Sequence, residues 1–127
     1  MIIDTHHHQI LSASDEKIRS ILSDSIRFSK IAFKHADVDH LFKKAKETWP
    51  DPDGEKLIAW MDETGIDFTL ICGVDILEDK ELTPEVVQAQ NKTIAHIAKK
   101  HPDRVAALAG VNPFRDNAVD IVAEFME

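Results

Sequence analysis

The chain has 127 residues, of which 43% are hydrophobic and 30% are charged, a composition typical of a folded globular protein. Lys and Arg number 15 against 23 Asp and Glu, so the formal net charge at pH 7 is −8. Because no basic stripe interrupts this negative excess, we expect neither nucleic acid nor an anionic membrane surface as a partner. No apolar run reaches the roughly 18 residues of a membrane span and the amino terminus lacks signal-peptide features, so a cytoplasmic protein is predicted.

Three short apolar segments, each bounded by polar or turn residues, are typical of β-strands. They span Met1 to Thr5, Phe68 to Cys72 and Val105 to Val111. The second and third are apolar almost without alternation, which favours strands covered on both faces, as in a parallel sheet. Cys72 is the single cysteine, and its place in the second segment predicts a buried strand thiol.

Helices with clear start and stop signals are predicted after these strands. The first begins at Asp53 and ends at Gly65, which is placed to take a left-handed cap conformation. The second begins with Thr83 as its N-cap and ends before Pro102. A third begins near Asp116. Strands and helices therefore alternate, which predicts right-handed βαβ crossovers and a parallel sheet.

A long segment separates the first strand from the first of these helices. It has more than forty residues, whereas an ordinary loop between a strand and a helix has about 2 to 6. Two helices are predicted inside it, over 15–33 and 38–49, so that about 9–52 forms a helical cap insertion. The polar residues His35, Asp37, Asp39 and His40 match no common set of metal ligands in their spacing. Capping of the second helix by Asp37, with solvated histidines, is the favoured interpretation.

His6 and His8 follow the first strand with one residue between them. Alternate residues of a strand share a face, so both imidazoles can reach one point, with Asp4 deeper on the same side and His7 facing the other way. Neutral imidazole suits zinc and related first-row ions, and Asp4 could support a ligand from behind. The same spacing also arises by chance on protein surfaces. It gains weight here because the pair ends a strand of a βα unit, where barrel enzymes keep their active sites.

Asp75, Asn112 and Arg115 follow the second and third strands, and the loops that carry them should share one rim with the histidine pair. We predict that the three bind substrate, with Arg115 holding a carboxylate in a forked, charge-assisted pair. An exposed arginine beside a helix start, and turn-forming roles for Asp75 and Asn112, fit the pattern equally well.

Three motifs, in their order and spacing, resemble the amidohydrolase superfamily, in particular its amidohydrolase-related branch, which includes aminocarboxymuconate-semialdehyde decarboxylase. The motifs are Ile3–His8, Met61–Asp67 and Asn91–Pro113, so the resemblance covers most of the chain. It implies an α/β fold that forms the first three β/α units of a TIM (β/α)8 barrel, with the helical insertion after strand 1. It also implies that His6 and His8 bind a catalytic divalent metal, for which zinc is the first choice.

The family completes its metal site with a histidine after a later strand and an aspartate after the last one, so the catalytic acid–base residues are expected beyond residue 127. A full barrel needs about 250 residues. We therefore expect the chain to be the opening portion of a longer protein, or a short form that pairs with another copy or with the remainder of the barrel.

The resemblance implies a small-molecule substrate and two possible reactions. The first is hydrolysis of an amide, ester or lactone of a small organic acid, with metal-activated water as the nucleophile. The second is metal-dependent non-oxidative decarboxylation. A rival interpretation, from a different class of protein, is a non-catalytic barrel fragment that serves in assembly.

Overall fold

The computed structural model describes residues 1–8, 14–28, 37–49, 51–76, 79–80 and 82–126. The chain divides into two compact units. The larger unit consists of Met1–Gln9 and Asp51–Glu127, and the smaller unit of Ile10–Pro50. Each unit has its own packing and is described separately.

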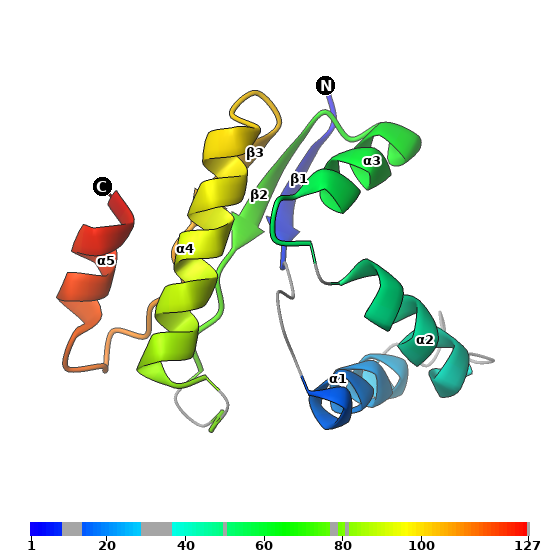
Figure 1. The fold of residues 1–127 in the computed structure, drawn as a ribbon, viewed down its shortest axis with the longest axis horizontal. Coiled ribbons are helices and arrows are strands. Elements are labelled where there is room, and N and C mark those ends of the chain that lie inside the picture. The colour runs from blue at the N-terminus through cyan, green and yellow to red at the C-terminus, as the bar shows by residue number, and fades with distance from the viewer. Residues whose placement is uncertain (9–13, 29–36, 50, 77–78, 81, 127) are drawn as a thin grey trace. The chain divides into compact units, whose positions relative to one another are not determined.

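The larger unit is built on a parallel sheet with the strand order β1-β2-β3 (Figure 1). The strands are β1 (Ile3–His7), β2 (Phe68–Cys72) and β3 (Val105–Leu108). The predicted α/β class and the parallel sheet are therefore confirmed. Strand β3 is shorter than predicted because the chain leaves the sheet before Gly110, where its backbone meets that of Gly73.

Three helices follow the strands of this unit: α3 (Glu55–Thr64), α4 (Pro84–Lys100) and α5 (Ala118–Met126). Gly65 ends α3 with a φ of 74°, in the left-handed conformation predicted for it. The Thr83 side chain accepts a hydrogen bond from the Val86 N–H and so caps α4 as predicted. No helix in the described ranges is long and apolar enough to cross a membrane.

The core of the larger unit lies between one face of the sheet and helices α3 and α4. Its buried members are Leu57, Met61, Ile71, Ile94, Ile97 and Val105. The expectation that β2 and β3 are covered on both faces is wrong for the described residues. Leu108 of β3 is 50% exposed on the opposite face, and Cys72 of β2 there is only half-buried. The reason is topological, since successive right-handed crossovers in the order β1-β2-β3 place their helices on the same face.

The smaller unit contains two helices, α1 (Asp15–Phe28) and α2 (Val38–Thr48). The predicted capping role of Asp37 is confirmed, because its carboxylate accepts hydrogen bonds from the backbone N–H groups at the start of α2. Arg19 of α1 lies 4.0 Å above the Phe42 ring of α2 and so links the two helices. The predicted continuation of the first helix to residue 33, and His35, lie outside the described residues.

Two glycines meet where β2 and β3 leave the sheet. A β-carbon on Gly73 would lie 2.4 Å from the Gly110 nitrogen, and one on Gly110 would lie 2.5 Å from the Gly73 carbonyl carbon. The buried Asn91 side chain of α4 closes the junction: it donates to the Gly110 carbonyl and accepts from the Gly110 N–H, each at 2.9 Å. The segments after β2 and β3 are therefore fixed to each other and to α4.

This junction predicts that Gly110→Ala is strongly destabilising, because the new methyl group overlaps backbone atoms that cannot move independently. We expect a loss of about 3 kcal/mol in the free energy of unfolding, measured by urea denaturation. Gly65→Ala is the control: it has a positive φ but no atom within 4 Å of the added carbon, so only backbone strain applies. Its expected cost is about 1 kcal/mol. Equal losses in the two variants would contradict the close approach.

Candidate metal centre

The two histidines predicted to bind metal lie together. His6 is in β1 and His8 directly follows that strand, and both side chains are exposed. Their ring centroids are 4.6 Å apart and their planes are perpendicular. Two imidazoles at this separation can turn one nitrogen each toward a shared ion, which is the arrangement that the spacing predicted.

His8 is held by the backbone of the neighbouring strand. Its Nδ1 lies 2.9 Å from the Cys72 carbonyl oxygen. Because a carbonyl oxygen can only accept, Nδ1 carries the proton and Nε2 keeps its lone pair. Histidines that bind metals commonly donate through the second nitrogen in this way, which fixes both the tautomer and the direction of the ring. The donor set therefore fits a divalent ion, although the described residues contain no group of three or more potential ligands.

Strand β1 does not alternate regularly along its length. Asp4 pairs with Thr69 of β2, but His7 pairs with Ile71, so β1 has one residue more than β2 between these pairs. This irregularity is a β-bulge. Thr69 and Ile71 are both fully buried. Since paired residues of neighbouring strands point to the same side, Asp4 and His7 both face the helices.

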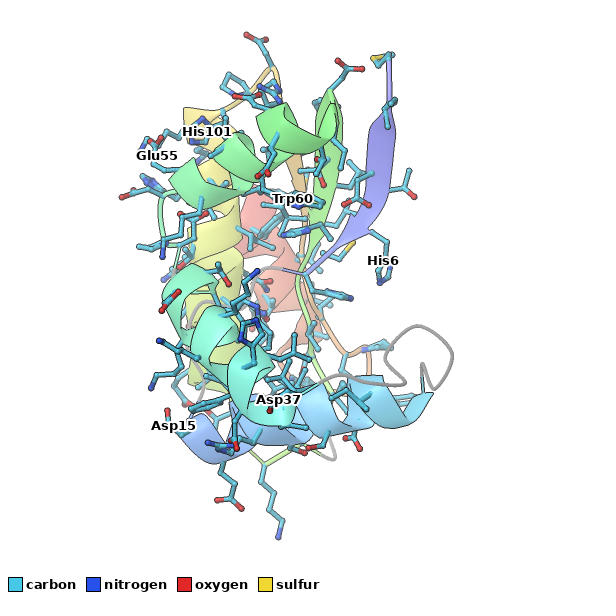
Figure 2. The ribbon with its side chains drawn as sticks, turned by 90° about the vertical axis from the view of Figure 1, so that its right-hand side faces the viewer. His6, Asp15, Asp37, Glu55, Trp60 and His101 are labelled. Atoms are coloured by element: carbon cyan, nitrogen blue, oxygen red, sulfur yellow. The ribbon has the colours of Figure 1, made fainter. Side chains whose placement is uncertain are left out.

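The side-chain contacts agree with this register. The Thr69 hydroxyl donates to Asp4 Oδ2 at 3.3 Å, and His7 Nδ1 lies 3.9 Å from the same oxygen. The His7 ring stacks obliquely near Trp60 of α3, with 6.0 Å between the centroids. In Figure 2 Trp60 lies on the α3 side of β1 and His6 projects away from it.

The expectation that Asp4 shares a face with His6 and His8 is therefore wrong, because the bulge reverses the alternation between Asp4 and His7. The expectation that His7 faces the other way from the pair agrees with its place near Trp60. A supporting role for Asp4 at the metal stays a prediction, but its carboxylate does not reach the imidazoles through the face that the spacing suggested.

The three rim residues predicted to bind substrate are also close together. Arg115 makes a forked pair with Asp75, at 2.7 Å from Nε to Oδ2 and 2.6 Å from Nη2 to Oδ1. Asp75 Oδ2 also accepts from the Asn112 N–H at 2.8 Å, and Arg115 Nη2 donates to the Leu82 carbonyl at 2.7 Å. The side chains of Asp75 and Arg115 are 1% and 11% exposed. These contacts join the segment after β2 to the segment after β3.

The forked geometry predicted for Arg115 is present, but its partner is Asp75 of the same chain. The alternative of an exposed arginine is wrong, because the guanidinium is buried against that carboxylate. The hydrogen bond from Arg115 lowers the pKa of Asp75, with a further contribution from the Asn112 N–H and against the effect of burial. Asn112 also accepts from the Phe114 N–H at 3.0 Å, which is the turn-forming alternative. Substrate binding by these three residues stays a prediction.

Some residues that position the site were not singled out from the sequence. The Cys72 carbonyl orients His8, and Asn91 bonds to Gly110 beside the rim. Every residue has a backbone carbonyl, so the residue type does not reveal which carbonyl orients a side chain. The usable signal was a glycine directly after the second predicted strand and another near the end of the third, because glycine in such places marks a close approach of backbones.

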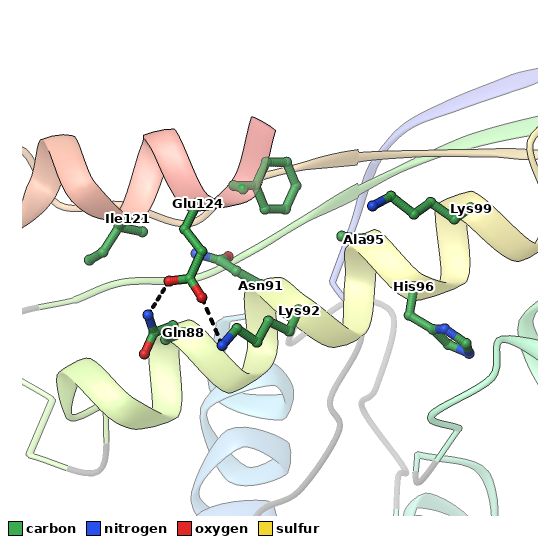
Figure 3. Close-up of a pocket in the computed structure, with 9 residues that line it drawn as sticks. Gln88, Asn91, Lys92, Ala95, His96, Lys99, Ile121 and Glu124 are labelled. Carbon is green, nitrogen blue, oxygen red and sulfur yellow. Dashed lines mark hydrogen bonds and ion pairs between the residues drawn. The ribbon is translucent and has the colours of Figure 1, made fainter. Parts of the chain in front are cut away.

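A separate hollow of about 280 Å³ lies between α4 and α5. Figure 3 shows Glu124 reaching across it to Gln88 and Lys92. It is lined by Gln88, Asn91, Lys92, Ala95, His96, Lys99, Ile121, Glu124 and Phe125. None of the residues predicted for the site is among them, so this hollow is not part of the candidate metal centre.

No family profile and no curated protein matches the chain. Solved structures do. The 5-carboxyvanillate decarboxylase of Novosphingobium aromaticivorans, with bound manganese and 4-hydroxy-3-methoxy-5-nitrobenzoic acid, matches 89% of the chain with 25% identity and a TM-score of 0.57. A variant of that enzyme matches with 23% identity and a TM-score of 0.59. The 4-oxalomesaconate hydratase of Rhodopseudomonas palustris matches 99% with 18% identity and a TM-score of 0.50. The chain spans 34% of the decarboxylase and 40% of the hydratase.

The contacts of Asp75 predict a specific dependence of stability on pH. The pKa of Asp75 in the folded chain lies below the ordinary value of an aspartate, so its ionised form stabilises the fold above the unfolded pKa, and this contribution is lost as pH falls through the folded pKa. We expect Asp75→Asn to lower the Tm by about 5 °C at pH 7. We also expect the variant to lose less stability than wild type between about pH 5 and pH 2, in thermal melts followed by circular dichroism.

Asp62→Asn provides the matched control for Asp75. Asp62 also pairs with an arginine, Arg104 at 2.8 Å, but its side chain is 62% exposed. An exposed ion pair contributes little, so the Tm should change by less than in Asp75→Asn. Parallel pH profiles for Asp75→Asn and wild type would show that the pair does not couple protonation to folding.

Proposed function

We propose that this chain, which belongs to the amidohydrolase superfamily together with the decarboxylase and the hydratase that it matches, supplies two metal ligands to an enzyme that acts on a small organic acid. The observation that carries the proposal is the His6–His8 pair at the carboxyl end of β1, with His8 fixed by the Cys72 carbonyl. The other ligands and the acid–base groups would come from further β/α units of the barrel, in the same polypeptide or in a partner.

The proposed ion is a divalent first-row metal. Two imidazole nitrogens suit zinc, and they suit neighbouring ions of that row as well. The solved decarboxylase contains manganese, which supports a divalent ion without favouring zinc over manganese. When bound, such an ion supplies a Lewis acid that polarises a substrate oxygen or lowers the pKa of water.

The chain's own contribution is to orient the ligands and to shape one wall of the site. Hydrogen bonding to Cys72 keeps His8 Nε2 available, because the proton is held on Nδ1. Leu70 and Leu108 belong to the sheet face opposite the buried Ile71, which is also the face of His6 and His8. An apolar wall beside the ligands would accept the carbon skeleton of an organic acid and exclude water from it.

Two reactions fit this arrangement. Attack of water on an amide, ester or lactone is the reaction first expected from the sequence, and the hydratase shows that a protein of this fold can use water as a reactant. Non-oxidative decarboxylation is supported by the carboxyvanillate decarboxylase, whose solved structure contains manganese and a substituted benzoic acid. Both reactions would need the metal ion that the two histidines hold, so they share the assignment of His6 and His8.

Metal binding tests the assignment of the two ligands. We expect His6→Ala and His8→Ala each to weaken zinc binding by about 10-fold or more, measured by titration calorimetry on the full chain. His7→Ala is the matched control: it lies between them in sequence but faces Trp60, so its zinc affinity should equal that of wild type. Zinc binding that survives in the variant lacking both His6 and His8 would contradict the assignment of the two ligands, whereas a wild-type chain that binds no zinc would favour the non-catalytic assembly role.

Isotope labelling separates the two reactions. The protein is isolated in the assembly that it forms in its source cells, loaded with zinc or manganese, and incubated with hydroxybenzoic acids labelled with ¹³C at the carboxyl group and with aryl lactones in H₂¹⁸O. Release of ¹³CO₂, lost on replacement of His6 and His8, indicates decarboxylation. Incorporation of ¹⁸O into a product carboxylate indicates hydrolysis. Turnover that does not change in the double variant would contradict both.

A further inference from the structure

The pairing of β1 with β2 would, in a regular strand, place the histidine pair on the wrong face of the sheet for binding a metal. Thr69 and Ile71, the β2 partners of Asp4 and His7, are both fully buried and face the helices. In a strand of regular alternation, residues an even number of positions from Asp4 share its face. A regular β1 would therefore turn His6 and His8 toward the helices and leave His7 on the open face.

The bulge between Asp4 and His7 changes which face these side chains occupy. One extra residue in β1 reverses the alternation, so His7 joins Asp4 on the helix side, where its ring lies 6.0 Å from that of Trp60. His6 and His8 then emerge on the opposite face. The orientation of the candidate ligands depends on this one local irregularity.

A bulge leaves backbone groups without partners in the ladder of the sheet. The Asp4 side chain supplies a partner: its Oδ1 accepts from the His6 N–H at 3.1 Å. Aspartate suits this place because its short side chain reaches the N–H two residues further along. The other oxygen, Oδ2, accepts from the Thr69 hydroxyl at 3.3 Å, so the carboxylate ties the bulge to β2.

We propose that Asp4 is a positioning residue that holds the β1 bulge, and thereby turns His6 and His8 onto the face where a metal can bind. The role of the pair rests on the proposed function, but the bulge is a property of the fold and can be tested without metal. Asp4 acts through the backbone of His6 and the hydroxyl of Thr69, and its contribution needs an acceptor oxygen and not a negative charge.

The bond between His8 and Cys72 depends on the same register. A slip of β1 by one residue, which would restore regular alternation, moves His8 by about 3.3 Å along β2. That displacement takes Nδ1 out of hydrogen-bonding range of the Cys72 carbonyl, from which it is now 2.9 Å away. Loss of the bulge would therefore remove both the common face of the ligands and the bond that orients one of them.

Three variants and two measurements on the full chain test this role. Zinc affinity is measured by calorimetry, and the proximity of the His7 and Trp60 rings by nuclear Overhauser contacts without metal. We expect Asp4→Ala to weaken zinc binding by about 10-fold or more and to abolish the ring contacts. Asp4→Asn keeps one acceptor oxygen for the His6 N–H, and its NH2 group can donate to the Thr69 hydroxyl, which can also accept. The variant should therefore retain the ring contacts and a zinc affinity close to that of wild type.

Thr69→Val keeps the shape of the buried side chain but removes the hydroxyl that donates to Asp4. We expect weaker ring contacts and an intermediate zinc affinity, and this variant decides the matter if Asp4→Ala does not fold. If Asp4→Asn binds zinc as weakly as Asp4→Ala, the negative charge is what matters and the proposal is overturned. Unchanged ring contacts in both Asp4→Ala and Thr69→Val would also overturn it, because the bulge would then not depend on Asp4. If wild type binds no zinc, the proposed function fails, while the ring contacts still decide whether Asp4 holds the bulge.

Discussion

Parallel pairing of β1 with a buried β2 is the constraint on which the rest of the structure depends. Thr69 and Ile71 are fixed by the core between the sheet and its helices, so β1 must fit a strand whose orientation is already decided. The bulge between Asp4 and His7 is the local adjustment that lets a strand end with two histidines outside the core. A site of this kind costs some regularity in the sheet, and bulges are frequent beside active sites for that reason.

The carboxyl end of the sheet is held by contacts that are structural in kind but set the geometry of the candidate site. Asn91 locks the meeting of the two glycines beyond β2 and β3, and Asp75 and Arg115 tie the following segments together. Cys72 lies directly before the first of these glycines, and its carbonyl orients His8. Packing that fixes the end of β2 therefore also fixes the direction of the His8 ring, as the second partners of metal-binding histidines generally do.

Much of the fold could be predicted because its signals are local. A threonine followed by proline starts α4, a glycine ends α3, and an apolar run marks β2. What the sequence could not show depends on distant partners. The bulge arises from the register between β1 and β2, so a rule of alternation placed Asp4 on the wrong face. Arg115 pairs with the carboxylate of Asp75, which is 40 residues away in the sequence. No spacing pattern in the sequence distinguishes such a partner from a substrate carboxylate.

We propose that His6 and His8 share one divalent ion, with His8 binding through the nitrogen that Cys72 leaves available. Anomalous diffraction at the zinc absorption edge, from crystals of the protein soaked in zinc, locates the ion directly. We expect a peak about 2.1 Å from Nε2 of His8 and from a ring nitrogen of His6. A peak on Nδ1 of His8, or zinc bound only at other side chains, would contradict it.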